Sequence, residues 1–224
     1  MENTIKVAID GPAGAGKSTI ARAAAKKLGY IYVDTGALYR TVGVNALRLG
    51  LDTTDKTAVE GTLGDVKVEL RFVDGEQQVL LNGEVVSAEI RTPEASMAAS
   101  NVSAIPAVRE FLFNLQREIA DKNNCIMDGR DIGTVVLPYA QVKIFLTASP
   151  EKRAQRRYDE LIAKGTQVDY KDVLEDLIKR DYNDSHREVA PLKPAEDSVI
   201  VDTSELDLEQ SKAKVIQVIR EKLQ

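Results

Sequence analysis

The chain has 224 residues, of which 43% are hydrophobic and 29% are charged, and its formal net charge is -5. This composition is that of a globular protein with enough length for one core and an accessory insert. The negative charge argues against non-specific binding to nucleic acid or to a membrane surface, because both would require an excess of basic residues.

No stretch approaches the roughly 20 apolar residues that span a bilayer, and the first residues lack the basic and apolar segments of a signal peptide. We therefore expect a cytoplasmic protein. Cys125 and His186 are the one cysteine and the one histidine, too few for a disulfide within the chain or a zinc site. We interpret Cys125 as a small buried apolar residue.

Five short apolar runs are bounded by polar or glycine-containing segments, which is typical of strands buried on both faces. They span residues 5–9, 30–33, 125–127, 142–146 and 199–201. Helical patterns lie between them, for example over residues 108–119, where apolar side chains recur at the 3.6-residue spacing of one helix face. Strands that alternate with helices predict a doubly wound α/β core with a five-stranded parallel sheet.

The segment after the first run, residues 11–18, reads GPAGAGKS and matches the phosphate-binding pattern G-x-x-x-x-G-K-[ST]. It follows a predicted strand and precedes a helical pattern that reaches Leu28, with Gly29 as the expected cap. Glycines let backbone N–H groups turn toward a phosphate, and the helix N-terminus adds partial positive charge. We expect Lys17 to reach the β- and γ-phosphates of a nucleoside triphosphate and Ser18 to ligate Mg²⁺. A glycine-rich turn without a ligand is the disfavoured alternative.

The residues expected at the triphosphate are Gly11, Pro12, Ala13, Gly14, Ala15, Gly16, Lys17, Ser18 and Thr19.

Residues 66–72 break the rhythm of buried strands, because apolar and polar side chains alternate there. The turn dipeptides Asp74-Gly75 and Asn82-Gly83 follow, so this segment is predicted to form an antiparallel β-meander. Because the meander lies between two strands of the parallel type, we expect an inserted subdomain that spans residues 35–102.

Asp128 directly follows the strand at 125–127, at the carboxyl end where α/β sheets bind their ligands. We expect it to hold the Mg²⁺ shell, with a turn formed with Gly129 as the alternative. The second strand ends in Asp34-Thr35-Gly36, and Tyr39-Arg40 follows, so Arg40 is a candidate phosphate clamp, although a solvated arginine is the more common situation.

A helical pattern near the C-terminus places charged residues opposite an apolar side. The charged residues Arg180, Asp184 and Arg187 are expected to share one face, and the apolar side consists of Val173, Leu174, Leu177 and Ile178. A ligand-binding face and a set of surface ion pairs are the two interpretations.

Three arginines, Arg153, Arg156 and Arg157, lie on one predicted helix after Ser149-Pro150. Residues 163–166 fit a hinge, so we expect a mobile lid whose arginines fold over the transferring phosphoryl group and exclude water. A solvated basic helix is the alternative.

The four arginines Arg40, Arg130, Arg180 and Arg187 supply more positive charge than a triphosphate needs, so we expect the acceptor to be a phosphate as well. A phosphate monoester is largely dianionic at pH 7 and needs no general base, whereas an alcohol acceptor would need one. His186 is the one histidine that could serve, and we interpret it as an exposed helix residue.

Six ordered segments resemble the bacterial cytidylate kinase family: GPAGAGKS, DTGALYR, the meander, DGRDIGTVV, the arginine-rich lid and RDYNDSHREVAPL. The resemblance implies a monomer that uses Mg²⁺ and transfers the γ-phosphoryl group of ATP to CMP or dCMP. It also implies a P-loop core of residues 1–34, 103–150 and 171–224, an insert of residues 35–102 that binds the nucleoside monophosphate, and a lid of residues 151–170.

The resemblance also implies roles for individual residues. The positions that match Arg40, Arg130 and Arg187 hold the acceptor phosphate in the family, with Thr35 beside it; Ser100, Arg109 and Asp131 face the cytosine; and Arg180 and Asp184 approach the sugar. We expect the catalytic group to consist of Lys17, Asp128, Arg130 and Arg157, with Ser18 and Asp128 at the metal.

The choice of base has a chemical logic of its own. Cytosine offers an N4 amino donor to Asp131 and the acceptors N3 and O2 to Arg109, whereas uracil presents an acceptor at position 4. CMP is therefore expected to be favoured over UMP. Two alternatives stay open: a P-loop kinase of UMP or a small alcohol such as shikimate, and a nucleotide-controlled switch. The switch is disfavoured because the chain has no N-K-x-D base-reading motif.

Overall fold

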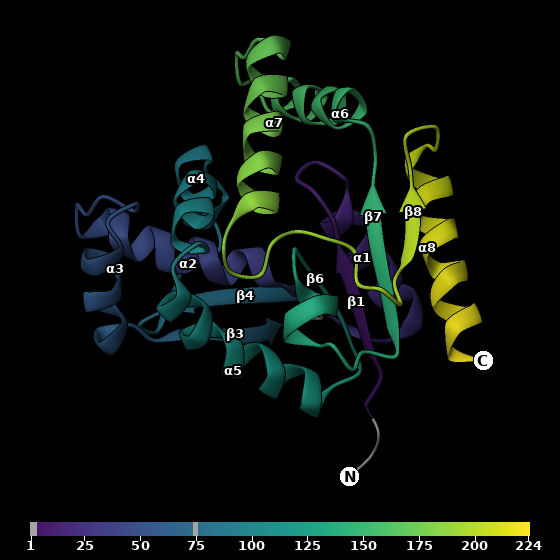
Figure 1. Ribbon diagram of the computed structural model, residues 1–224, viewed down its shortest axis with the longest axis horizontal. Coiled ribbons are helices and arrows are strands. Elements are labelled where there is room, and N and C mark those ends of the chain that lie inside the picture. The colour runs from purple at the N-terminus through teal and green to yellow at the C-terminus, as the bar shows by residue number, and fades with distance from the viewer. Residues whose placement is uncertain (1–3, 74–75) are drawn as a thin grey trace.

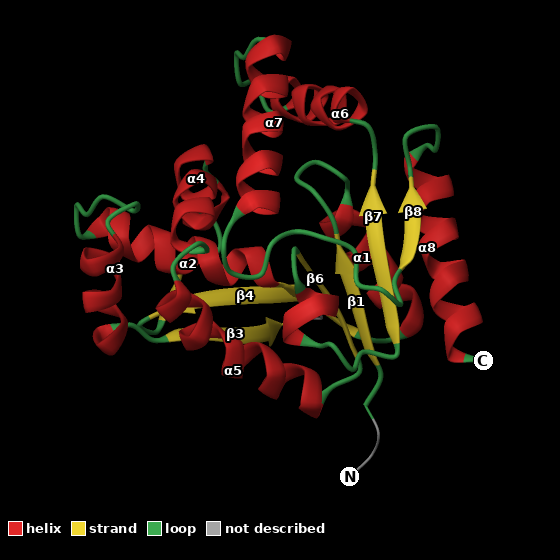
Figure 2. Cartoon of the chain, in the orientation of Figure 1, coloured by secondary structure: helices red, strands yellow, loops and turns green. Residues whose placement is uncertain are grey.

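The central sheet of the computed structural model, which describes residues 4–73 and 76–224, has five parallel strands in the order β2-β6-β1-β7-β8 (Figures 1 and 2). Their bounds are Lys6–Asp10 for β1, Ile31–Asp34 for β2, Cys125–Gly129 for β6, Val142–Thr147 for β7 and Val199–Asp202 for β8. All five strands expected from the sequence are present, and β1 lies in the middle. The loop after β1 therefore lies at the centre of the sheet's carboxyl edge, where α/β folds bind ligands.

Helices cover both faces of this sheet, so alternate residues of a strand point into different cores. On β1, Ile9 packs toward α1 (Lys17–Leu28) and α8 (Leu208–Leu223), whereas Ala8 packs toward the end of α5 (Pro106–Lys122). Burial on both faces is the reason that the strands contain continuous apolar runs.

The last strand, β8, differs from the expectation that all five strands are buried on both faces. It is an edge strand, and its residues alternate between a covered and an open side. Val201 packs in the core beneath α8, whereas Ile200 points to the opposite side and is 61% exposed.

The segment between β2 and β6 begins with two helices, continues with an antiparallel sheet of order β3-β4-β5, and ends with two more helices, α4 and α5 (Figure 1). The bounds before α5 are Thr35–Arg48 for α2, Lys56–Thr62 for α3, Val68–Val73 for β3, Glu76–Leu81 for β4, Glu84–Val85 for β5 and Pro93–Val102 for α4, with 3₁₀ turns at Leu63–Asp65 and Glu89–Arg91. The predicted meander is confirmed, although its first strand begins at Val68.

The β4–β5 turn is formed by Asn82 and Gly83, whose φ values of 50° and 85° are those of a type I′ hairpin turn. The other expected turn, Asp74-Gly75, lies outside the described residues. Helices α2 and α4 approach so closely that a Cβ on Gly43 would lie 2.8 Å from the Cβ of Ala98. The segment thus has a core of its own, which the N-terminal half of α5 completes.

Helices α6 (Pro150–Ala163) and α7 (Tyr170–His186) lie above the sheet in Figure 1, and α7 runs down toward the middle of the molecule. The helix ends before Arg187, whose backbone is extended, with φ -65° and ψ 144°. The expectation that Arg187 shares a helix face with Arg180 and Asp184 is therefore wrong. The chain turns back at this point, and the N–H of Leu192 donates to the carbonyl of Asp184.

The apolar side of α7 is also narrower than expected. Val173 and Leu177 pack against Ala154 of α6, but Ile178 lies outside this contact and is 51% exposed. Within residues 4–73 and 76–224, no helix has the length and apolar character that crossing a membrane requires.

Candidate active site

The phosphate-binding sequence forms the loop between β1 and α1. The loop passes so close to β7 that a Cβ on Gly11 would lie 1.9 Å from the carbonyl oxygen of Leu146, which explains the glycine at this position. Gly16 has φ 84° and stands at the N-cap of α1, where no side chain caps the helix. The backbone N–H groups of the first turn therefore face the loop without competition from a capping side chain.

All of the residues expected at the triphosphate lie in this loop or in the first turn of α1. Lys17 is buried, and its Nζ donates to the carbonyl of Pro12 across the loop at 2.8 Å. Burial and the neighbouring guanidinium of Arg130 lower the pKa of Lys17. Lys17 and Arg130 are far apart in the sequence, but their positive charges lie close together in the fold.

Asp128 lies at the end of β6 with its carboxylate beside the loop, so it is more than a turn residue. Its Oδ2 accepts a hydrogen bond from the Ser18 hydroxyl at 3.0 Å, and its Oδ1 accepts one from the Tyr32 hydroxyl at 2.9 Å. Its backbone carbonyl accepts one from the Thr35 hydroxyl at 2.8 Å. Burial, and then the nearby Asp34 carboxylate, raise the pKa of Asp128.

Ser18 and Asp128 offer the oxygen ligands that Mg²⁺ prefers. Among residues 4–73 and 76–224, no group of three or more His, Cys, Asp and Glu side chains could hold a metal ion. Magnesium needs few protein ligands, because water and substrate phosphates complete its shell. The pair therefore fits a magnesium ion that binds together with a triphosphate.

Arginines from several elements gather beside the loop. The Nε of Arg130, after β6, donates to Asp184 of α7 at 2.7 Å, and an Nη of Arg40, on α2, donates to Asp34 at 2.7 Å. The Nε atoms of Arg40 and Arg180 are buried and have no hydrogen-bond partner among the described residues. Burial, and then Arg130, lower the pKa of Arg180.

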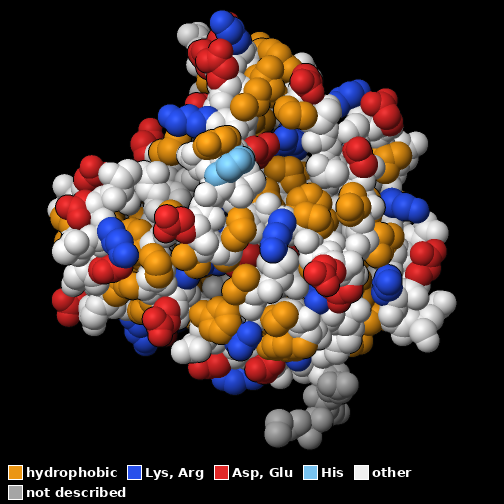
Figure 3. All heavy atoms as spheres, viewed as in Figure 1, with side chains coloured by type: hydrophobic (Ala, Val, Ile, Leu, Met, Phe, Trp, Pro, Cys, Tyr) orange, Lys and Arg blue, Asp and Glu red, His pale blue; other side chains and the backbone are white. Residues whose placement is uncertain are grey.

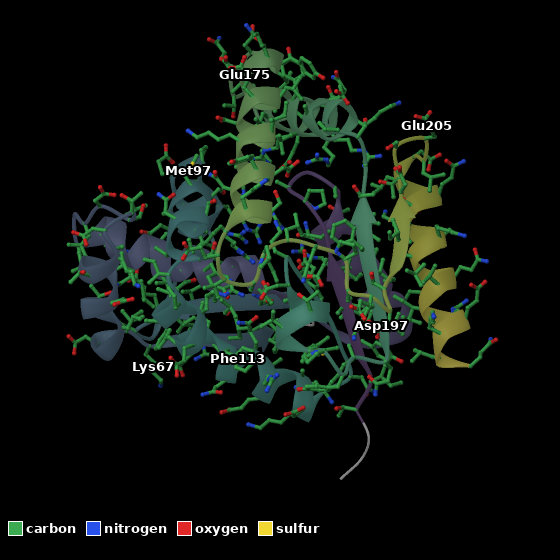
Figure 4. All side chains as sticks on the ribbon, viewed as in Figure 1. Lys67, Met97, Phe113, Glu175, Asp197 and Glu205 are labelled. Atoms are coloured by element: carbon green, nitrogen blue, oxygen red, sulfur yellow. The ribbon has the colours of Figure 1, made fainter. Side chains whose placement is uncertain are left out.

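A bound oxyanion would accept hydrogen bonds from these buried donors and would offset the repulsion between the clustered positive charges. Figure 4 shows nitrogen and oxygen tips crowded below α7, between α2 and the ends of β1 and β6. The labelled Glu175 and Phe113 lie away from this region.

Asp131 is buried beside the arginine cluster and is held by two further arginines. Its Oδ2 accepts a hydrogen bond from Arg109 of α5, and its Oδ1 accepts one from Arg187 at 3.1 Å. The Arg109 guanidinium also lies 5.6 Å from the centre of the Tyr39 ring. Three residues that are distant in the sequence thus form one buried charged group.

A pocket of about 130 Å³ opens next to Arg187, between the end of α4 and the end of α7. Its lining consists of Ser100, Asn101, Ser103, Ala104, Asn183, Asp184 and Arg187. Ser100, Asp184 and Arg187, which the sequence analysis assigned to the acceptor, share this pocket.

The three arginines of α6 differ in their surroundings. Arg153 is buried and donates to the Ala13 carbonyl of the loop at 2.8 Å, and Arg156 donates to the carbonyl of Thr203 at 2.6 Å. The Arg157 side chain is 37% exposed and pairs with Glu160. The expectation that all three arginines are available to fold over a substrate is therefore wrong for Arg153 and Arg156, because backbone carbonyls hold them in place.

His186 and Cys125 lie as the sequence suggested. The His186 ring is on the surface, where it is visible as the pale-blue side chain in Figure 3, and it stacks on Tyr182 with 4.0 Å between ring centres. Cys125 is fully buried in β6, and burial raises the pKa of its thiol to about 12.

Two residues of this region, Asp10 and Tyr32, were not expected from the sequence, and Arg153 was expected in the lid rather than against the phosphate loop. Asp10 precedes the loop as the last residue of β1, and burial raises its pKa to about 6. Asp10 could have been predicted, because it lies at the carboxyl end of a strand, the feature that identified Asp128 as a candidate site residue. Tyr32 gave no such signal, because nothing local distinguishes a strand tyrosine that faces a site from one that does not.

Comparisons with known proteins agree with this geometry. The family model described as "Cytidylate kinase" matches residues 7–221. The cytidylate kinase of Caldicellulosiruptor bescii is 50% identical over 214 residues, which are 96% of this chain and 95% of that protein. The cytidylate kinase of Caldanaerobacter subterraneus is 51% identical over 217 residues, which are 97% and 95% of the two chains.

Among solved structures, an uncharacterized protein from Eubacterium ventriosum superposes with a TM-score of 0.54 at 13% identity, over 97% of this chain and 99% of that one. This likeness concerns the fold alone. The family match over nearly the whole chain and the relatives at about half identity establish the lineage: the chain belongs to the cytidylate kinase family.

Proposed function

We propose that this protein transfers the γ-phosphoryl group of ATP to CMP or dCMP and releases ADP with CDP or dCDP. The observation that carries the proposal is the group of arginines beside the phosphate loop: Arg130 pairs with Asp184, and the buried Nε atoms of Arg40 and Arg180 have no hydrogen-bond partner among the described residues. Two adjacent anion sites are what phosphoryl transfer between two phosphate-bearing substrates requires. Relatives named cytidylate kinase support the choice of acceptor.

In this proposal, residues 11–19 bind the triphosphate of ATP. Backbone N–H groups of the loop and the N-terminus of α1 hold the phosphate oxygens, and Lys17 moves its ammonium from the Pro12 carbonyl to the β- and γ-phosphates. A bound Mg²⁺ would neutralise phosphate charge at Ser18 and Asp128. Tyr32 keeps the Asp128 carboxylate oriented toward that position.

The acceptor phosphate would bind Arg40, Arg130 and Arg187, with Thr35 beside it. Because this phosphate is largely dianionic near pH 7, it attacks without a general base, and catalysis consists of alignment and charge stabilisation. Lys17, Arg130 and the exposed Arg157 would stabilise the charge on the transferring group.

The base would bind next to the pocket beside α4, where Ser100 lines the pocket and Arg187 connects it to Asp131 and Arg109, while Arg180 and Asp184 hold the sugar. The Asp131 carboxylate already accepts hydrogen bonds from two guanidinium groups. Cytosine fits this arrangement, because its N4 amino group donates to Asp131 while Arg109 turns to N3 and O2.

The domain limits belong to the same proposal. We assign residues 1–34, 103–150 and 171–224 to the core, 35–102 to the acceptor-binding insert and 151–170 to the lid. We also propose a cytoplasmic monomer, because one chain can supply all of the residues assigned to the two substrates above.

Replacement of Asp131 tests the acceptor. Asp131→Ala removes the acceptor of the N4 hydrogen bond, so the ratio of kcat/KM for CMP to that for UMP should fall at least about tenfold, since a hydrogen bond to a charged group contributes roughly 1.5–3 kcal/mol. The KM for ATP should change less. Initial rates in a coupled assay give both quantities.

Asp121→Ala is the control, because this exposed carboxylate pairs with Lys6 at the start of β1, at the opposite end of that strand from the phosphate loop. It should leave the CMP-to-UMP ratio unchanged. A wild-type ratio in Asp131→Ala would refute the assignment of the base.

A further inference from the structure

The Asp131 carboxylate stands in an unusual position for an aspartate that begins a helical turn. Asp131 is the N-cap of the π-helical turn Ile132–Val136, where an aspartate ordinarily accepts hydrogen bonds from the N–H groups of its own turn. Its side chain makes no such bond. Both carboxylate oxygens are instead turned to Arg109 and Arg187.

A second aspartate takes over the capping. The Oδ1 of Asp10 accepts a hydrogen bond from the N–H of Ile132 at 2.8 Å, and its Oδ2 accepts one from the N–H of Gly133 at 2.7 Å. Residue 133 suits this approach, since a Cβ there would lie only 3.3 Å from the Asp10 oxygen.

The position of Asp10 is fixed by the central sheet. It is 5% exposed and ends β1, where its backbone pairs with β6 on one side and with β7 on the other. It also directly precedes Gly11, the first residue of the phosphate loop. The capping carboxylate is therefore fixed to the centre of the sheet.

We propose that Asp10 is a positioning residue for acceptor selectivity: by capping the turn in place of Asp131, it leaves the Asp131 carboxylate turned toward the base site. Without Asp10, two buried N–H groups lose their partner, and the nearest replacement is the side chain of Asp131 itself, which would rotate away from Arg109 and Arg187. This inference rests on the proposed function, since it assumes that Asp131 reads the base.

The experiment is a double-mutant cycle with Asp10→Asn and Asp131→Ala. The amide oxygen of Asp10→Asn can accept one N–H, but its NH₂ group faces the other as a second donor. At saturating ATP, Asp10→Asn should lower the ratio of kcat/KM for CMP to that for UMP by about tenfold, the factor that corresponds to one lost hydrogen bond to a charged group. In the Asp131→Ala background the same substitution should leave the ratio unchanged, because the residue it acts through is absent.

Asp207→Asn is the matched control. Asp207 caps α8 by accepting the N–H of Gln210 at 2.8 Å, on the surface and away from the site. It should lower the melting temperature and keep the wild-type ratio. If Asp10→Asn does not fold, Gly133→Ala is the second variant: its Cβ would press on the Asp10 Oδ2 and on the Lys143 side chain, each 3.3 Å away, and should lower the ratio likewise.

The outcomes separate the inference from the proposed function. Wild-type enzyme that does not phosphorylate CMP refutes the proposed function. An Asp131→Ala effect together with a wild-type ratio in Asp10→Asn overturns the role of Asp10, and so does an equal loss in both backgrounds. A crystal structure of Asp10→Asn gives a readout without activity: the inference requires Asp131 to have turned to the N–H groups of Ile132 or Gly133, and an unmoved Asp131 contradicts it.

Discussion

The carboxylate of Asp128 is approached from two sides by hydroxyl groups of different elements, Ser18 of α1 and Tyr32 of β2. The two hydroxyl groups have different roles in the proposed mechanism. The Ser18 hydroxyl can leave the Asp128 carboxylate and ligate a metal. The Tyr32 hydroxyl donates to the other carboxylate oxygen, Oδ1, and thereby orients the carboxylate.

Metal dependence should distinguish these two residues. In Ser18→Ala, the gain in ADP affinity that Mg²⁺ gives should shrink by at least about tenfold, because a direct oxygen ligand is lost and even the loss of an outer partner costs roughly tenfold or more. In the control Tyr32→Phe the gain should shrink less, while the free energy of unfolding falls by about 1 kcal/mol. Calorimetric titration of ADP with and without Mg²⁺ measures this. Equal effects in the two variants would remove Ser18 from the metal site.

At the scale of elements, α6 is held by its own arginines. Arg153 donates to the carbonyls of Ala13 and Ala148 and pairs with Asp181 of α7, so one side chain joins the phosphate loop, the end of β7 and α7. The sequence predicted the helix and its arginine-rich character. It could not predict which arginines face inward, because the partners come from residues far away along the chain.

Substitution of two of these arginines should give opposite results. Arg153→Met leaves the Asp181 carboxylate without its partner and should lower the free energy of unfolding by about 3 kcal/mol, as expected for one half of a buried pair. Arg157→Met should change stability by less than about 1 kcal/mol, because its pair with Glu160 is exposed. It should instead lower kcat about a hundredfold if Arg157 stabilises the transferring phosphoryl group.

Urea titration and steady-state kinetics separate these effects. A fully active Arg157→Met would exclude that arginine from catalysis, and an Arg153→Met enzyme as stable as the wild type would show that the buried contacts do not anchor α6.

At the scale of the whole molecule, the features predicted correctly are those that local sequence determines. The five apolar runs, the end of α1 at Gly29 and the Asn82-Gly83 turn each depend on a few neighbouring residues. Ile200 is exposed because β8 is at the edge of the sheet, and Arg187 leaves the helix because the chain turns after α7. The periodicity of the sequence indicates neither feature.

The candidate site divides in the same way. The loop at residues 11–18 and Asp128 were predictable, since each lies at the carboxyl end of a strand in a recognisable pattern. The group formed by Arg109, Asp131 and Arg187 was expected only through the resemblance to a family. Its assembly requires α5, the end of β6 and the end of α7 to meet in space.

The most direct test of the account is product analysis. The enzyme would be incubated with ATP, Mg²⁺ and one acceptor at a time, CMP, dCMP, UMP, AMP or shikimate, and the products separated by chromatography. An enzyme that phosphorylates cytidine nucleotides should yield equal amounts of ADP and CDP, or of ADP and dCDP, with less product from UMP and none from shikimate. Phosphorylation of another acceptor without any CDP or dCDP would contradict it.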